Sequence, residues 1–163
     1  EARYLYGRSC HYRCAGDAGM ILAIDPGSQK TGMALVKDDG RLYWKAIVPS
    51  GEVPSTAVRL VREASARAVV MGNGTRHREM QERVESALRA ARMALSVELV
   101  DEKYTTEMGK ARWMADHPPK GLARLLPRGL RTVEEPVDDY VAWIIGQIYL
   151  GVVRAEDVGH KKV

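Results

Sequence analysis

Acidic residues that could hold a divalent cation occur at three separate places in this sequence. They follow the first strand-like apolar run, follow the last such run, and begin the final helical pattern: Asp25; Asp101 and Glu102; Glu135, Asp138 and Asp139. A carboxylate at the end of a buried strand is unfavourable unless a cation lies opposite it. Converging carboxylates repel one another, and Mg²⁺ or Mn²⁺ removes that repulsion because these hard ions prefer oxygen ligands. If the fold brings Asp25, Glu102 and Asp138 together, the sequence predicts a divalent-metal site.

The chemistry that such a site performs is phosphodiester hydrolysis. Two divalent ions about 3.5–4 Å apart activate a water molecule and stabilise the leaving oxygen of a phosphodiester. We expect Asp25 to bridge the two ions, with Glu102 and Asp138 on either side. Acids in the first turn of a helix also stabilise the helix dipole, so Asp138 and Asp139 have a structural alternative. Asp25 is the hardest acid to explain without a cation, because Asn or Ser would serve at a strand-to-turn junction.

The elements expected around these acids alternate between strands and helices. Five apolar segments are expected to be strands: Met20–Asp25, Thr31–Lys37, Arg41–Val48, Ala68–Gly72 and Val97–Glu102. Four segments with helical spacing are expected to be helices: Thr56–Arg67, Glu79–Ala94, Thr105 or Thr106 to about His117, and Val137 to about Val153. The order predicts an α/β protein with a mixed five-stranded sheet, three antiparallel strands followed by parallel ones, and helices on both faces. This order is similar to that of the ribonuclease H-like fold.

The composition is that of one soluble globular domain. The chain has 163 residues, of which 45% are hydrophobic and 28% are charged, so it is too apolar for a disordered protein. No apolar run approaches the roughly 20 residues that span a bilayer, so we expect no membrane segment. We expect the folded domain to cover residues 20–154. An N-terminal extension (1–19), either not native or poorly ordered, precedes it, and a polar tail (155–163) follows.

The cysteines and the charge limit the function further. Cys10, His11 and Cys14 have no second Cys/His pair at zinc-like spacing, so we expect no zinc site and a cytoplasmic location. The formal net charge of +4 permits a polyanionic partner. Basic residues follow the middle strand and precede the last helix: Arg76 and Arg78; Lys120, Arg124, Arg128 and Arg131. We expect them to bind nucleic-acid phosphates without reading bases, the alternative being a solvated loop.

Three segments, in this order, resemble motifs of one protein family. They are "ILAIDPGSQKTGMALV" from Ile21, "VELVDEKYTT" from Val97 and "VDDYVAWIIGQIYL" from Val137. The first resembles a stretch shared with RuvC resolvases, and the second resembles the Val-Asp-Glu-Arg-x-Thr-Thr motif of the YqgF (RuvX) family. The chain therefore resembles the YqgF family, in the RuvC-like branch of the ribonuclease H superfamily. It departs from the family after the middle strand, where Gly72-Asn73-Gly74 replaces a common Gly-x-Pro, and at Lys103, where an Arg is usual.

This resemblance implies a metal-dependent nuclease. It implies that Asp25, Glu102 and Asp138 are the catalytic acids and the metal ligands. The substrate would be structured RNA, as in maturation of the small-subunit ribosomal RNA precursor, or branched DNA, as in Holliday junction resolution. We favour RNA, and we expect a homodimer if the substrate is a DNA junction.

Two other function classes share some of these features. A nucleic-acid-binding module with the same fold and no activity would keep both the acids and the basic residues. An ATPase of the actin or sugar-kinase type has a first phosphate loop that resembles Asp25–Gly32. Such an ATPase needs a second lobe, for which we expect a chain of 163 residues to have no room.

Overall fold

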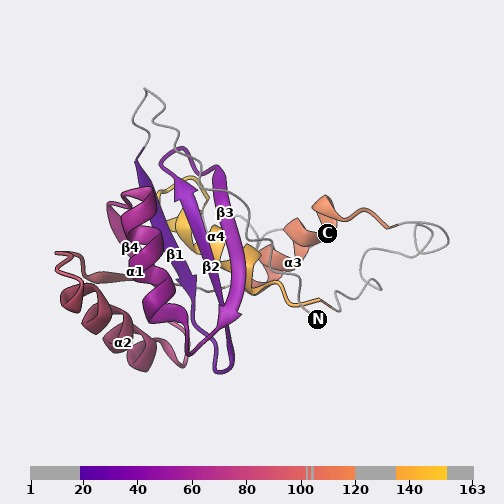
Figure 1. The fold of residues 1–163 in the computed structure, drawn as a ribbon. Helices are drawn as coiled ribbons and strands as arrows, with labels where there is room; N and C mark the ends of the chain where they lie inside the picture. Colours follow the sequence, from indigo (N-terminus) through magenta and orange to yellow (C-terminus); the bar gives the residue numbers. More distant parts are fainter. Residues whose placement is uncertain (1–18, 102, 104, 120–134, 154–163) are drawn as a thin grey trace.

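The strands and helices follow one another in the expected order. The structure, a computed structural model, describes residues 19–101, 103, 105–119 and 135–153. Its strands are β1 (Met20–Asp25), β2 (Lys30–Lys37), β3 (Leu42–Pro49), β4 (Ala68–Gly72) and β5 (Val97–Val100). Its helices are α1 (Val53–Ala64), α2 (His77–Ala90), α3 (Thr105–Asp116) and α4 (Asp138–Tyr149) (Figure 1). The expected extension and tail fall outside the described residues, apart from residue 19, so this division of the chain stays a prediction.

The five strands form one mixed sheet with the order β3-β2-β1-β4-β5. β1 pairs antiparallel with β2, and β2 pairs antiparallel with β3, whereas β4 and β5 run parallel to β1. Three antiparallel strands followed by two parallel ones, with helices on both faces, form the ribonuclease H-like arrangement, so the expected fold class is confirmed. Because β1, β4 and β5 run in the same direction, their carboxyl ends lie at one edge of the sheet.

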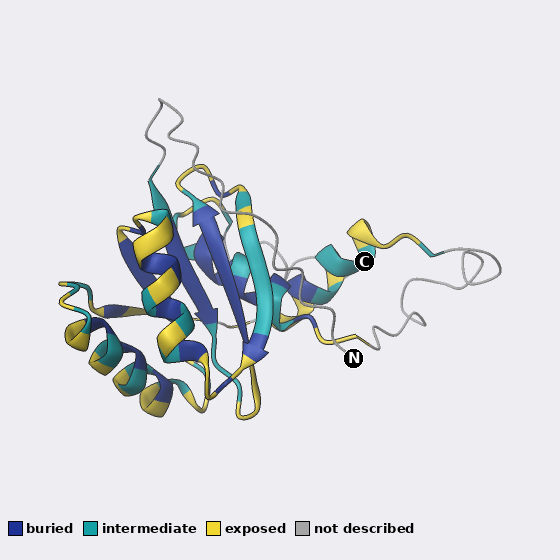
Figure 2. Ribbon diagram, viewed as in Figure 1, coloured by how far each residue is buried: buried dark blue, intermediate teal, exposed yellow. Residues whose placement is uncertain are grey.

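Side chains of the sheet alternate between two cores, one on each face. From β1, Leu22 and Ile24 enter the core under α1 and α2, whereas Ile21 and Ala23 enter the core under α4. This alternation follows from the two-residue period of a strand. Figure 2 shows β1 and β2 buried along most of their length, between the two helical layers. The same alternation decides which residues at the strand ends face α4.

Helices α1 and α2 differ from their expected ranges at both ends. α1 begins before the expected Thr56, because Pro54 occupies the first turn, where its missing N–H group is not needed. α2 ends before the expected Ala94, because the N–H of Met93 donates to the carbonyl oxygen of Leu88 at 2.9 Å and closes the helix. Such hydrogen bonds at the end of a helix have no clear sequence pattern here, so hydrophobic periodicity places these ends incorrectly.

The last strand and the last helix are also shorter than expected. β5 ends at Val100, so Asp101 lies beyond the strand. α4 ends before the expected Val153, because the N–H of Val152 donates back to the carbonyl oxygen of Gln147 at 3.0 Å. The longest described helix, α2, has 14 residues. No helix in the described part of the chain has both the length and the apolar character needed to cross a bilayer.

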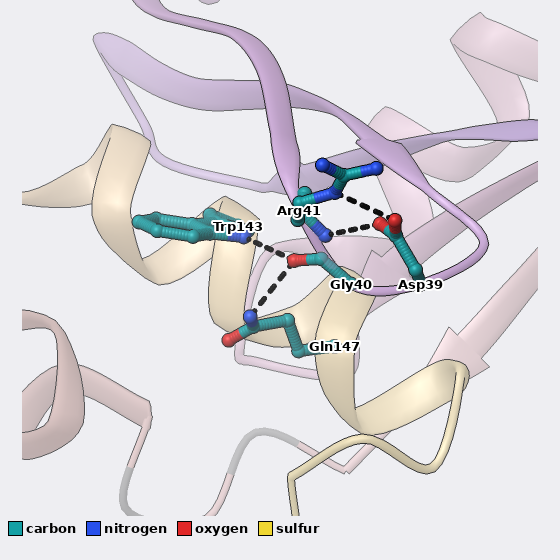
Figure 3. A network of polar contacts seen from close by, with 5 residues as sticks. All are labelled: Asp39, Gly40, Arg41, Trp143 and Gln147. Atoms are coloured by element: carbon teal, nitrogen blue, oxygen red, sulfur yellow. Dashed lines mark hydrogen bonds and ion pairs between the residues drawn. The ribbon is translucent and has the colours of Figure 1, made fainter.

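The far end of α4 is fastened to the turn between β2 and β3. Nε1 of Trp143 and Nε2 of Gln147 both donate to the carbonyl oxygen of Gly40, each at 2.9 Å (Figure 3). Oε1 of Gln147 accepts from Arg112 of α3 at 2.6 Å, and the Arg112 guanidinium lies 4.4 Å from the centre of the Trp143 ring. Because these bonds are directional, they set the position of α4 along the sheet, and with it the position of its first residue, Asp138.

Candidate active site

Asp25 lies at the carboxyl end of β1, on the face that α4 covers. Ile21 and Ala23 belong to the core under α4, and residues two apart in a strand share a face. Asp25 is therefore on the α4 face, where it is half-buried and pairs in register with Gly32 of β2. Its expected place at the end of the first strand is confirmed.

Asp138 begins α4 directly against Gly32. A Cβ atom at position 32 would lie 1.9 Å from the carbonyl oxygen of Asp138, so only glycine lets the helix start here. Gly32 is also the residue with which Asp25 pairs across the sheet. Two acids far apart in the sequence, Asp25 and Asp138, are therefore both neighbours of the same glycine.

The ends of β4 and β5 lie at the same edge of the sheet as Asp25. The N–H of Asn73, directly after β4, donates to the carbonyl oxygen of Val100, the last residue of β5, at 3.0 Å. Asp101 follows Val100 at this edge and is exposed. Glu102, the third expected metal ligand, lies outside the described residues.

The described residues include two of the three expected metal ligands. Asp25 and Asp138 offer carboxylate oxygens, the donor type that Mg²⁺ and Mn²⁺ prefer, so their chemistry fits such an ion. Within the described ranges, no group of three or more His, Cys, Asp or Glu side chains is placed to hold a metal ion. A complete set of ligands therefore requires Glu102, and the metal site stays a prediction.

Burial makes Asp138 less acidic than an ordinary aspartate. Burial and, second, the negative charge of Asp139 raise the pKa of Asp138, whereas the nearby Lys30 lowers it. A raised pKa means that the charged carboxylate is disfavoured until a cation compensates it. Acids with shifted pKa values are found preferentially at functional sites, although structural ion pairs also shift them.

Asp139 faces different neighbours from Asp138. It forms an ion pair with Lys45 of β3, whose ammonium group lies 3.9 Å from the centre of the Tyr140 ring. The Tyr140 hydroxyl donates to Asp116 of α3 at 3.1 Å, and burial together with this bond raises the pKa of Tyr140 to about 12. These contacts hold the first turn of α4 against both β3 and α3.

Arg76 and Arg78 are exposed in the segment that follows the carboxyl end of β4. Arg76 directly precedes α2, and Arg78 lies in its first turn. Between them, Nδ1 of His77 bonds to the carbonyl oxygen of Gly74 at 2.6 Å and closes the loop. The other expected phosphate-binding residues lie outside the described residues: Lys120, Arg124, Arg128 and Arg131. Phosphate binding by all six stays a prediction.

Sequence patterns alone do not single out Lys30 and Lys45, which flank the start of α4. Lys30 precedes Gly32 by two residues in β2, and Lys45 pairs in register with Ala34. Strand alternation could have placed Lys30 on the same face as Gly32 and Ala34. Nothing in the sequence indicates that α4 begins between these two lysines, because that contact joins segments from opposite ends of the chain.

Similarity to known proteins is found among solved structures. No protein-family model and no curated protein matches the chain. Among solved structures, 72 chains match. RuvC from Thermus thermophilus is 14% identical with a TM-score of 0.46, and the alignment covers 78% of this chain and 90% of RuvC.

Sugar kinases are also among the similar structures. A ROK-family glucokinase from Streptomyces griseus is 20% identical with a TM-score of 0.38, covering 58% of this chain and 37% of the kinase. An inorganic polyphosphate/ATP-glucomannokinase from Arthrobacter is 15% identical with a TM-score of 0.39, covering 63% and 52%. The chain therefore spans about half or less of the length of these kinases.

Proposed function

We propose that this protein is a divalent-metal-dependent nuclease that hydrolyses phosphodiester bonds in structured nucleic acid. Asp25, Glu102 and Asp138 would hold Mg²⁺ or Mn²⁺. The observation that carries the proposal is the placement of Asp25 and Asp138 beside Gly32, at the edge where the parallel strands end. The chain that leads to Glu102 leaves β5 at this same edge.

Each acid has a role that follows from its place in the fold. When bound, Mg²⁺ or Mn²⁺ supplies a Lewis acid that lowers the pKa of a water molecule and neutralises charge on the phosphate. Asp25 ends the central strand of the sheet, so we assign it the role of a metal ligand. Asp138 is half-buried, so its carboxylate is already partly desolvated and would gain strongly from a cation.

Basic residues supply contacts to the sugar-phosphate backbone in this proposal. Arg76 and Arg78 are exposed beyond the end of β4, and mobile cationic side chains bind phosphates regardless of base sequence. The resemblance to YqgF motifs favours structured RNA, such as a small-subunit ribosomal RNA precursor, over branched DNA. If a four-way DNA junction is the substrate, two active sites are needed for its two cuts, and we then expect a homodimer.

Cleavage of labelled nucleic acid tests the proposal. A labelled RNA hairpin and a labelled four-way DNA junction are each incubated with the protein in Mg²⁺, Mn²⁺ or EDTA. We expect cutting with either ion and none in EDTA. Asp25→Asn and Asp138→Asn should each lower the rate by at least about a hundredfold, because each removes a charged metal ligand.

A matched control comes from the opposite edge of the sheet. Asp39 is an exposed acid in the turn between β2 and β3, so Asp39→Asn should cut at the wild-type rate. Cutting that persists in EDTA, or an Asp25→Asn variant as fast as wild type, contradicts the proposal. Binding of either substrate without any cutting would instead identify an inactive nucleic-acid-binding module.

A further inference from the structure

Lys30 stands at the start of β2, on the same face of the sheet as Asp138. Ala34 and Val36 of β2 belong to the core under α4, and Gly32 contacts the Asp138 backbone. Because residues two apart in a strand share a face, Lys30 also faces the α4 side. It is exposed, at the end of the strand and beyond the cover of the helix.

The turn between β1 and β2 holds the backbone of Lys30 in a fixed place. A Cβ atom at position 27 would lie 1.9 Å from the carbonyl oxygen of Lys30, so Gly27 allows the turn to close tightly. The hydroxyl of Thr31 accepts from the N–H of Gly27 at 3.3 Å, and the hydroxyl of Ser50 donates to the carbonyl oxygen of Gly27 at 2.9 Å. The two hydroxyls are 2.8 Å apart, and both residues are buried. These bonds fix the backbone of the turn that joins Asp25 to Lys30.

The two lysines that flank α4 differ in what they bind. Lys45 is committed to Asp139, with which it forms an ion pair. Lys30 lies near enough to Asp138 to lower the pKa of that carboxyl. Among the described residues, however, no ion pair joins Lys30 to any carboxylate. Lys30 thus presents a positive charge beside the candidate active site that is not held in an ion pair within the described part of the chain.

We propose that Lys30 binds a backbone phosphate of the nucleic acid next to the bond on which Asp25 and Asp138 act. This inference rests on the proposed function. An ammonium group on a flexible stem is a strong donor to phosphate oxygens and reads no base. The turn from Asp25 to Lys30 would then carry both a metal ligand and a phosphate-binding side chain, at a spacing that Gly27, Thr31 and Ser50 keep constant.

Equilibrium binding tests the role of Lys30 apart from catalysis. Fluorescence anisotropy is measured in EDTA, which blocks cutting, with a labelled RNA hairpin and a labelled four-way DNA junction across a NaCl series. Lys30→Met should weaken binding about tenfold, as expected for the loss of one charge-assisted hydrogen bond. The negative slope of log K against log salt should become shallower by about 0.9 for the duplex arms, because one phosphate contact is lost. Lys30→Arg should retain most of the affinity.

Lys37 provides the matched control, because it lies at the opposite end of the same strand. Lys37→Met removes the same charge and should leave both the affinity and the salt slope unchanged. Melting temperatures show whether each variant is folded. A folded Lys30→Met variant with wild-type affinity and salt slope overturns the role of Lys30, whereas a wild-type protein that cuts neither substrate in Mn²⁺ overturns the proposed function. If Lys30→Met weakens the binding of only one substrate, the phosphate that Lys30 binds belongs to that nucleic acid.

Discussion

The two faces of the sheet are built in different ways. Under α1 and α2, the core consists of apolar side chains, and large ones such as Leu22, Met71 and Leu88 are fully buried. Such contacts stabilise in proportion to the apolar area removed from water and have no preferred direction. This face therefore stabilises the fold mainly through the burial of apolar side chains.

Under α4, small strand residues and polar bonds replace many of the large side chains. Ala23 and Ala34 line the sheet, and Gly32 lets the helix start against it. Polar bonds then tie both ends of the helix: the first turn to β3 through Lys45 and the last turn to Gly40. Hydrogen bonds weaken steeply when their geometry changes, so these bonds set where α4 begins. The face under α1 and α2 thus mainly stabilises the fold, whereas the face under α4 positions Asp25 and Asp138.

The largest expected effect comes from filling the space at Gly32. Gly32→Ala places a methyl group against the Asp138 carbonyl and should push back the first turn of α4. We expect the unfolding free energy to fall by about 1–3 kcal/mol, as for other overpacked sites. Single-turnover cleavage should fall by at least about a hundredfold, because metal ligands tolerate little displacement. Gly51→Ala, where no atom lies within 4 Å of the added carbon, is the control.

Truncating a core side chain under α1 and α2 should lower stability and leave the cleavage rate unchanged. Leu88→Ala leaves a cavity under α2 and should lower the unfolding free energy by about 2–5 kcal/mol, measured by urea unfolding. The cleavage rate per folded molecule should equal that of wild type. Leu99→Ala removes a side chain that is 45% exposed and should change stability far less. A large loss of rate in folded Leu88→Ala would show that the two faces are not separable.

A smaller effect is expected at the ion pair that crosses the second face. Lys45→Met leaves Asp139 half-buried without its partner and should lower the unfolding free energy by about 1–3 kcal/mol. The rate should fall as well, because the first turn of α4 loses its tie to β3. Replacing both residues, Lys45→Met with Asp139→Leu, should recover stability, since no lone charge remains.

The exposed ion pair on the opposite helical layer is the comparison for Lys45. Arg59 and Glu63 of α1 are 3.0 Å apart and both are exposed. Arg59→Met should therefore change stability by no more than about 1 kcal/mol and leave the rate unchanged. If Arg59→Met and Lys45→Met have equal effects in urea unfolding, the polar contacts under α4 have no special positioning role.

The smallest effect is the dependence of stability on pH at Asp138. Its pKa is raised in the folded state, so the folded protein holds this proton more tightly than the unfolded chain does. Ionised Asp138 therefore lowers stability as the pH rises from the ordinary value of 3.8 through the raised pKa, and below 3.8 the penalty is absent. In EDTA, Asp138→Asn should raise the melting temperature at neutral pH, and this gain should disappear below pH 3.8.

Added metal should reverse the order of the melting temperatures of wild type and Asp138→Asn. Mn²⁺ should raise the melting temperature of wild type and not that of Asp138→Asn, because only wild type has the full set of ligands. The measurement is a thermal melt in EDTA and in Mn²⁺ over a pH series. If Asp138→Asn raises the melting temperature equally at acid and neutral pH, the ionisation of Asp138 is not the cause of the increase.

Much of the sheet could be predicted because its signals are local. The short continuous apolar run of β1 and the Asp-Gly turn after β2 indicate paired strands without any knowledge of distant residues. The ends of α2 and α4 could not be placed, since each depends on a backbone hydrogen bond to a residue one turn earlier, such as Met93 to Leu88. Lys45 could not be assigned to Asp139 because the two residues meet only through packing of α4 on β3.

By itself, the amino-acid sequence determined the strands, the order of the elements and the acids capable of metal chemistry. Those features depend on side-chain type and on periods of two and 3.6 residues, which are properties of short segments. Only the tertiary structure decided that Asp25 and Asp138 share Gly32 as a neighbour, that Asp139 pairs with Lys45, and that Lys30 has no such pair among the described residues. The physical reason is that these contacts join distant segments, whose positions depend on packing across the whole sheet.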